Sequence, residues 1–226
     1  ALGLWSSMGQ LRAAVDATAM NALVAALRPA AEWAHALRLL RSALDAKLAD
    51  CALCNAVATC GRQEWQQAVA VLRGMLQAEV EPDIITFSAV ISACEADGEW
   101  SYALYTLQEM VSRHISPNII ACNACIAACA AAGRWKEATR LLSSMPCRPD
   151  VVSYNSVLAC ERALNWRICV QLLEEMRTAG VGADAFTYNS AIAVLDSQWQ
   201  VAVHLLREMA SSQLQPDLVT YGAVVS

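Results

Sequence analysis

The stretch 84-IITFSAVISACEADGEWSYALYTLQEMVSRHISPN-118 decides the fold of this chain. Apolar residues follow a helical spacing in its first part, and the Asp97-Gly98 pair then predicts the end of a helix. A second helix is predicted from Trp100 past Met110, and Ser116-Pro117 stops it. The stretch therefore predicts two helices joined by a tight turn.

The same pattern recurs along the chain every 32 to 35 residues. A short apolar-aromatic motif precedes one polar position in each copy, which is occupied by Asn21, Asn55, Ser88, Asn123, Asn155, Asn189 and, at the last copy, Gly222. The complete units are 17–50, 51–83, 84–118, 119–150, 151–184 and 185–217, and partial units lie at 1–16 and 218–226. Self-similarity at this period predicts a single all-α domain, a right-handed solenoid of stacked helical hairpins.

The second helix of every unit carries one apolar stripe. The stripe begins at a tryptophan. The residue three positions after it is Ala or Cys, and the residue seven positions after it is Leu. The residue ten positions after it is Met in five of the six units. These positions share one face of a helix, where alanine permits close approach and Leu and Met fill the space between helices. In unit 119–150, which is short, the segment Met145–Pro149 is expected to disturb the second helix.

Composition limits the functional classes. The formal net charge is −5 and the isoelectric point is about 5.2, which gives no support to bulk electrostatic attraction for nucleic acid. The longest uncharged stretch, 116–133, contains Pro117, Asn118 and Asn123, so we expect no membrane span. Neither end carries a polar capping helix, which predicts a longer protein or a partner over the ends.

Ten cysteines are present, and their positions favour packing over metal binding. Cys60, Cys94, Cys129 and Cys160 occupy a row in which another unit has Ala26, as expected of small buried residues. The Cys51-x2-Cys54 and Cys122-x2-Cys125 pairs lack a second well-spaced ligand pair. We expect no metal and no cofactor, and a reducing compartment.

The units resemble pentatricopeptide repeats over almost the whole chain. The segments that carry the resemblance are PDIITFS at 82–88, PDVVSYN at 149–155, ADAFTYN at 183–189 and PDLVTY at 216–221. Tetratricopeptide repeats have a similar length but lack this Pro-Asp hinge followed by an aromatic-Asn pair. The resemblance implies organellar RNA metabolism in a chloroplast or mitochondrion, with single-stranded RNA as the partner.

The resemblance also implies which side chains contact RNA. In the family, the first helices line a concave groove, and the fifth and last residues of each unit read one base. Here these pairs are Asn21 and Asp50, Asn55 and Asp83, Ser88 and Asn118, Asn123 and Asp150, Asn155 and Asp184, and Asn189 and Asp217. The second residues, which pack between bases in the family, are Thr18, Ala52, Ile85, Ile120, Val152 and Phe186. By the family's code the implied ligand is UUAUUU.

Each half of the pair has an alternative explanation. Asp or Asn directly before a helix is a good N-cap without any RNA. Asn inside the first helix is a poor helix former away from any cap, so a hydrogen-bonding role across the groove explains it better.

Two observations weaken the RNA hypothesis. The twelfth residues, where we expect phosphate contacts, include Arg28, Arg62 and Arg162 but also Glu95, Ala130 and Asp196. Repeat lengths also vary. A protein-binding scaffold or accessory subunit of an organellar ribosome, photosystem or respiratory complex is therefore the alternative function.

We expect no enzymatic activity, because the sequence has no Gly-rich phosphate loop, no nucleophile-base pair and no zinc deaminase signature.

Overall fold

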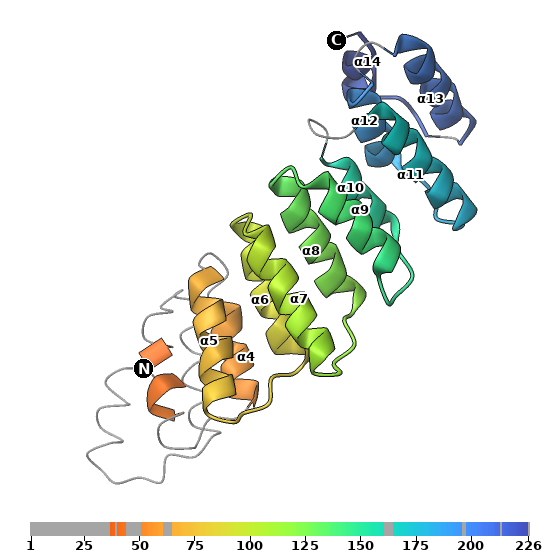
Figure 1. Ribbon diagram of the computed structural model, residues 1–226. Coiled ribbons are helices and arrows are strands. Elements are labelled where there is room, and N and C mark those ends of the chain that lie inside the picture. The colour runs from red at the N-terminus through yellow and green to blue at the C-terminus, as the bar shows by residue number, and fades with distance from the viewer. Residues whose placement is uncertain are drawn as a thin grey trace. The chain divides into compact units, whose positions relative to one another are not determined.

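The computed structural model describes residues 37, 38, 40–43, 51–60, 65–160, 165–195, 198–212 and 214–225. All regular secondary structure in these residues is helical (Figure 1). The chain divides into two compact units, Ala1–Pro117 and Asn118–Ser226. The all-α prediction is confirmed, while the single continuous array stays a prediction.

The helices follow the predicted hairpins. The first compact unit contains α4 (Cys51–Cys60), α5 (Trp65–Gln77), α6 (Ile84–Ala96) and α7 (Trp100–Ser112). The second contains α8 (Ile119–Ala131), α9 (Trp135–Ser144), α10 (Val151–Leu158), α11 (Trp166–Thr178), α12 (Ala185–Ala193), α13 (Trp199–Ser211) and α14 (Leu218–Val225). Even-numbered helices are the first helices of repeats and odd-numbered helices are the second helices. The Trp at the start of each odd-numbered helix confirms the predicted boundary.

Packing runs from one repeat to the next within each compact unit (Figure 1). In the first, α4 packs against α5 and α6, and α6 packs against α7. In the second, α8 packs against α9 and α10, α10 against α12, and α12 against α13 and α14. First helices therefore pack side by side, and each is backed by a second helix of its own repeat.

The ends of the first helices are set by local chemistry. Asp83, Asp150 and Asp184 are N-caps whose carboxylates accept backbone N–H groups of the next turn, and each forms a reciprocal capping box. At the other end, Gly98 and Gly133 follow α6 and α8 with φ of 70° and 68°. Glycine adopts this left-handed conformation without steric cost, so the chain can reverse direction at each of these two glycines and enter the second helix.

The Ala and Met rows of the second helices form the core. Ala103 and Ala138 are fully buried, and so are Met75, Met110 and Met209. The Trp row differs from the prediction, because these indoles are only partly covered and Trp199 is 64% exposed. The tryptophan starts its helix, so neighbouring helices cover only one side of its ring.

Unit 119–150 has a shortened second helix, as predicted. α9 has 10 residues, whereas α5, α7, α11 and α13 have 13 each. Met145 follows the helix with φ −57° and ψ 137°, an extended conformation. Pro146 enforces this end, since proline disfavours a helical conformation in the preceding residue.

The cysteine row packs as predicted where its side chains are described. Cys94, Cys129 and Cys160 are buried. Burial raises the pKa of each of these thiols to about 11, so they stay protonated near neutral pH. The side chain of Cys60 lies outside the described residues. None of the described helices has the length and apolar character that crossing a membrane requires.

The Met row supplies a matched pair for testing the core. Met110 is fully buried in α7, whereas Met145 is half-buried beyond the end of α9. We expect Met110→Ala to lower the free energy of unfolding by about 2–5 kcal/mol, because it leaves a cavity between helices. Met145→Ala should lower it by less than about 1 kcal/mol. Urea unfolding followed by circular dichroism measures both, and equal losses would contradict this packing.

Candidate functional site

A hydrogen-bonded triad joins neighbouring repeats at four of the described junctions. Between units 151–184 and 185–217 it consists of Asn155, Asp184 and Thr187. The Asn155 amide nitrogen donates to the Asp184 carboxylate, at 3.2 Å to Oδ1 and 3.3 Å to Oδ2. The Thr187 hydroxyl lies 2.7 Å from Asn155 Oδ1, and the Thr187 backbone N–H donates to Asp184 Oδ1 at 2.8 Å. One carboxylate thus caps a helix and holds the side chain of the previous repeat.

Three other junctions repeat this triad. The amide nitrogens of Asn55, Asn123 and Asn189 donate to Asp83, Asp150 and Asp217 at 3.1, 3.1 and 3.4 Å. The hydroxyls of Thr86, Ser153 and Thr220 lie 2.5, 2.6 and 2.7 Å from the oxygens of the same Asn side chains. Four of the predicted base-reading pairs are therefore in direct contact.

The hydroxyl row was missed by the sequence analysis. Thr86, Ser153, Thr187 and Thr220 are third residues of their units and are buried. A hydroxyl has one hydrogen, and its shorter distance to the Asn oxygen indicates that the hydrogen points there. The amide is thereby oriented with its nitrogen toward the carboxylate. The sequence does carry a signal for this row, because a Thr or Ser stands three residues after each capping Asp.

The carboxylates of the triads are stabilised in their charged form. Partial burial of Asp184 acts to raise its pKa, but hydrogen bonds from Thr187 and Asn155 outweigh this and hold the pKa below its ordinary value. The same balance lowers the pKa of Asp83 and Asp150. These groups therefore remain anionic acceptors at neutral pH.

The Ser88 and Asn118 pair is built differently. The Ser88 hydroxyl donates to the Ile84 carbonyl in its own helix at 2.7 Å, and Asn118 Oδ1 accepts the Ala121 backbone N–H at 2.8 Å. Ala121 has no hydroxyl with which to complete a triad. These two residues belong to different compact units, so their pairing stays a prediction. Six predicted site residues lie outside the described residues: Thr18, Asn21, Arg28, Asp50, Arg62 and Arg162.

The second residues of the repeats expose their apolar side chains. Ile85, Ile120, Val152 and Phe186 are 55%, 63%, 57% and 54% exposed, and Ala52 is also exposed. Burial is what normally stabilises side chains of this size, so a row of exposed ones indicates a contact surface. The sequence placed this row correctly on the first helices.

One hollow brings both kinds of predicted residue together. It has a volume of about 480 Å³ and lies over α8, α10 and α12. Val152, Asn155 and Phe186 line it together with Ser156, and its remaining lining consists of alanines of α8 and of Ala159, which follows α10. An amide and two exposed apolar side chains therefore converge on one open space.

The predicted phosphate row provides no cation among its described members. Of the twelfth residues, only Glu95 and Ala130 lie within the described residues. Partial burial raises the pKa of Glu95.

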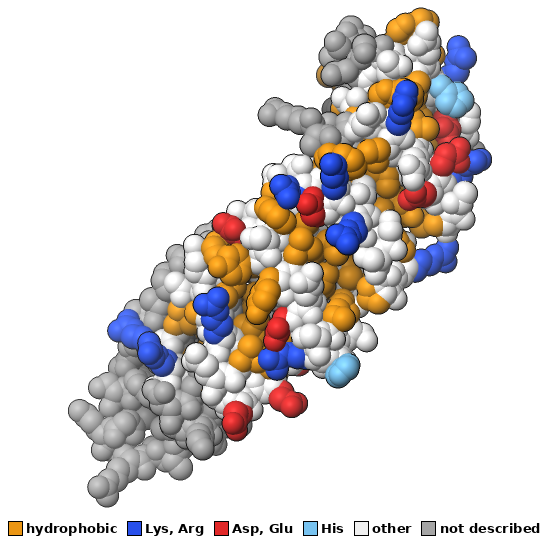
Figure 2. Space-filling model, viewed as in Figure 1, with side chains coloured by type: hydrophobic (Ala, Val, Ile, Leu, Met, Phe, Trp, Pro, Cys, Tyr) orange, Lys and Arg blue, Asp and Glu red, His pale blue; other side chains and the backbone are white. Residues whose placement is uncertain are grey.

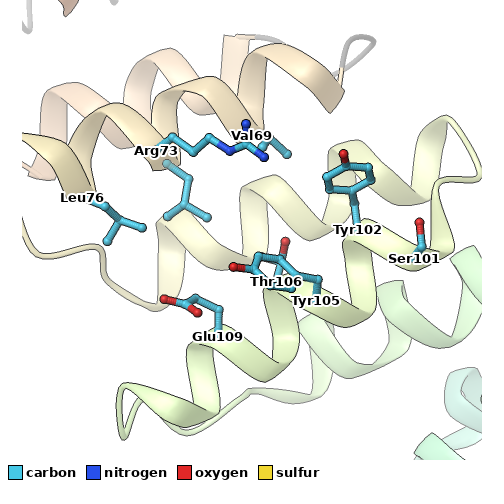
Figure 3. A pocket seen from close by; sticks show the side chains of 9 residues that line it. Val69, Arg73, Leu76, Ser101, Tyr102, Tyr105, Thr106 and Glu109 are labelled. Atoms are coloured by element: carbon cyan, nitrogen blue, oxygen red, sulfur yellow. The ribbon is translucent and has the colours of Figure 1, made fainter.

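A second hollow, of about 380 Å³, lies between second helices of the first compact unit. Val69, Arg73 and Leu76 of α5 face Tyr102 and Tyr105 of α7 across it (Figure 3). Hydrophobic side chains gather on this face over α5 and α7 (Figure 2). The sequence analysis did not single out these residues.

The aromatic character of this hollow comes from α7. The Trp65 and Tyr102 ring centroids lie 4.4 Å apart, and Tyr105 is 62% exposed. Other second helices carry Ala70, Arg140, Gln171 or His204 at the position of Tyr105. The hollow therefore has an aromatic wall, at a position where the sequence has no aromatic residue in the other complete repeats.

The described residues form sequential helical hairpins, and in four repeats an Asn side chain of the first helix is held at the next junction. These features define a helical-repeat protein. A family profile described as pentatricopeptide repeat domain matches residues 70–132, 105–162 and 171–226, more than half of the chain. The chain belongs to the pentatricopeptide repeat family, which confirms the resemblance seen in its sequence.

Solved structures place the fold in the same family. The pentatricopeptide repeat protein PPR10 from maize matches with a TM-score of 0.69 and 29% identity, covering 93% of this chain and 32% of PPR10. A crystal structure of PPR10 in complex with an 18-nt psaJ RNA element matches with a TM-score of 0.56 and 28% identity, covering 92% of this chain and 35% of that one. The chain thus spans about a third of the length of PPR10.

A more distant match shows the fold alone. It is nuclear proteinaceous RNase P 2 from A. thaliana, with a TM-score of 0.64 and 17% identity, covering 85% of this chain and 41% of that one. Among curated protein sequences, none matches the chain significantly.

The triad can be tested at its hydroxyl. Thr187→Val keeps the shape of the side chain but leaves the Asn155 oxygen and the Asp184 backbone N–H without this partner. We expect a loss of about 1–3 kcal/mol in the free energy of unfolding, which is typical of buried polar groups left unsatisfied. Thr178→Val, which removes a hydroxyl exposed at the end of α11, is the control and should change stability by less than about 0.5 kcal/mol. Equal effects in urea unfolding would show that the triad adds nothing.

Proposed function

We propose that this chain binds single-stranded RNA along its first helices, with one base per repeat and a preference for U-rich sequence. The observation that carries the proposal is the hollow in which Asn155 lies with Val152 and Phe186. Bases of single-stranded RNA can be splayed over apolar side chains while their edges remain free for hydrogen bonds. The RNA complex of PPR10, a relative with the same fold, supports the proposal.

The chemistry of the triad suits a base edge. Each Asn amide has two N–H groups, and each carboxylate oxygen accepts more than one hydrogen bond. The pair therefore offers a donor beside an acceptor, and every base edge presents a donor next to an acceptor. Since the hydroxyl fixes the amide orientation before RNA arrives, little ordering remains to oppose binding.

The base preference comes from the family's code. Asn with Asp favours U and Ser with Asn favours A, which gives UUAUUU with the N-terminal repeat at the 5′ side. The acidic net charge of −5 means that the proposal relies on stacking and base hydrogen bonds more than on phosphate contacts. Within this proposal the chain is a binding module of organellar RNA metabolism and carries out no catalysis.

The fifth repeat allows a switch of specificity with residues that the chain already uses elsewhere. Asn155→Ser combined with Asp184→Asn copies the Ser88 and Asn118 pair of unit 84–118. Asn118 caps α8, so Asn is expected to keep capping α12 after the exchange. We expect wild type to bind UUAUUU about ten-fold more tightly than UUAUAU, and the double variant to reverse this order, since one base contact contributes about 1–3 kcal/mol.

Fluorescence anisotropy with both labelled RNAs, placed within a longer neutral sequence, measures the four affinities. Both RNAs carry the same charge and length, so a difference in affinity between them reports the fifth base. The wild type and the double variant then serve as controls for each other. Equal binding of U-rich, A-rich and C-rich strands by wild type would contradict the proposal.

A protein-docking function is the second candidate, and the aromatic hollow between α5 and α7 favours it. An exposed tyrosine near an arginine, here Tyr105 and Arg73, is typical of protein interfaces, which are enriched in both residue types. A chain acting as an accessory subunit of an organellar complex could dock there without using its first helices.

Tyr105→Arg tests this second candidate, since Arg140 occupies the same position in another repeat. We expect the variant to lose a stoichiometric partner that co-purifies with the native protein, while its RNA affinity is unchanged. Gln108→Arg, an exposed change on the same helix, is the control. Co-purification of the same partner with both variants would exclude this hollow as the docking site.

A further inference from the structure

Two rows of side chains come together in the core of the repeats. One row is the fourth residue of the five complete units from 51–83 onward, which precedes the base-reading position: Cys54, Phe87, Cys122, Tyr154 and Tyr188. The other lies three residues before the capping Asp or Asn: Val80, Ile115, Cys147, Val181 and Leu214. Val80 packs against the core cluster that contains Cys54, and Leu214 packs against the cluster that contains Tyr188. The repeat symmetry therefore sets these two rows against each other.

Unit 119–150 is the one in which both rows carry cysteine. Cys122 lies in α8 and is 3% exposed, whereas Cys147 is half-buried in the connection after α9. The Cys147 thiol is a near neighbour that acts with burial to raise the pKa of Cys122. The neighbouring Asn123 and Asp150 side chains are themselves bonded at 3.1 Å, which fixes the two backbone segments beside each other.

The connection that carries Cys147 is also unlike its counterparts. In four other units the residue of this row donates its backbone N–H to the carbonyl of the Met that ends the stripe: Val80, Ile115, Val181 and Leu214. In unit 119–150 the helix has already ended at Ser144, and Met145 is extended. Cys147 therefore lies in a short segment outside a helical turn, where its side chain can adjust.

We propose that Cys122 and Cys147 form a redox site, at which a peroxide converts the two thiols into a reversible disulfide. Both residues belong to the second compact unit, so the site is complete within it. This inference stands independently of RNA binding.

The order of the reaction follows from exposure. The Cys147 thiolate attacks one peroxide oxygen, the O–O bond breaks, and the leaving hydroxide takes up a proton to give water. The resulting Cys147 sulfenic acid is attacked by the Cys122 sulfur as it loses its proton. The S–S bond forms, the S–O bond breaks, and a second water leaves. Two thiols and one hydrogen peroxide thus give one disulfide and two waters.

Cys122 is unsuited to react first. Burial and the neighbouring Cys147 raise its pKa to about 12, so it carries almost no thiolate near neutral pH. Cys129 and Cys160 are both buried, and neither offers the exposed thiol that the first step needs.

The test begins with the folded, reduced 226-residue chain and graded hydrogen peroxide. Remaining thiols are alkylated during unfolding, and the chain is digested with trypsin without reduction. We expect a linked species that joins the peptides 114–134 and 141–162, with fragmentation placing the bond at Cys122 and Cys147. Dithiothreitol should return both cysteines to alkylatable thiols.

Matched variants separate this site from other oxidation. Cys147→Val copies Val80 and Val181 and is expected to fold while abolishing the linked species. Cys122→Ala should also abolish it and leave Cys147 as a sulfenic acid or a more oxidised form. Cys125→Ala, which removes a buried thiol one turn along α8, should leave the linkage intact.

The inference is overturned if Cys147 is oxidised while Cys122 remains fully alkylatable in wild type. It is likewise overturned if the linked species persists in Cys147→Val, because another pair of cysteines then forms the bond.

Discussion

The capping aspartate that begins a first helix and also binds the previous repeat is the interaction on which four of the described junctions depend. Asp184 accepts the Thr187 backbone N–H, which begins α12, and it accepts the Asn155 amide of the previous repeat. A helix N-terminus attracts negative charge, and the same charge strengthens a hydrogen bond from a neutral amide. The start of one repeat is thereby tied to the middle of the one before it.

This constraint links stability to the proposed function. The triad holds Asn155 toward the open hollow formed with Val152 and Phe186, so the groups proposed to contact RNA are ordered by the fold itself. Capping and reading are therefore compatible uses of one carboxylate, where the sequence analysis had treated them as alternatives. The Asn row also has a structural role without RNA, which the structure alone reveals.

Departures from the repeat pattern identify where individual units have acquired properties of their own. Pro146 shortens α9, and Cys147 in the connection that follows is a near neighbour of Cys122. Tyr105 replaces smaller or polar residues of other second helices and gives the hollow between α5 and α7 an aromatic wall. Each departure changes a local surface while the alanine of the second helix beneath it, Ala103 or Ala138, stays fully buried.

The family resemblance implied the row of apolar residues that includes Phe186. Periodicity in the sequence determined the fold class and the helix boundaries, because helix spacing and caps are local properties. It could not show that Thr187 bridges Asn155 and Asp184, since that bond joins residues about 30 positions apart. It also overestimated the burial of Trp199, because this residue is the first of its helix and its neighbours cover it only partly. Tertiary structure decided which side chains meet between repeats, because those contacts depend on how helices stack and not on their individual patterns.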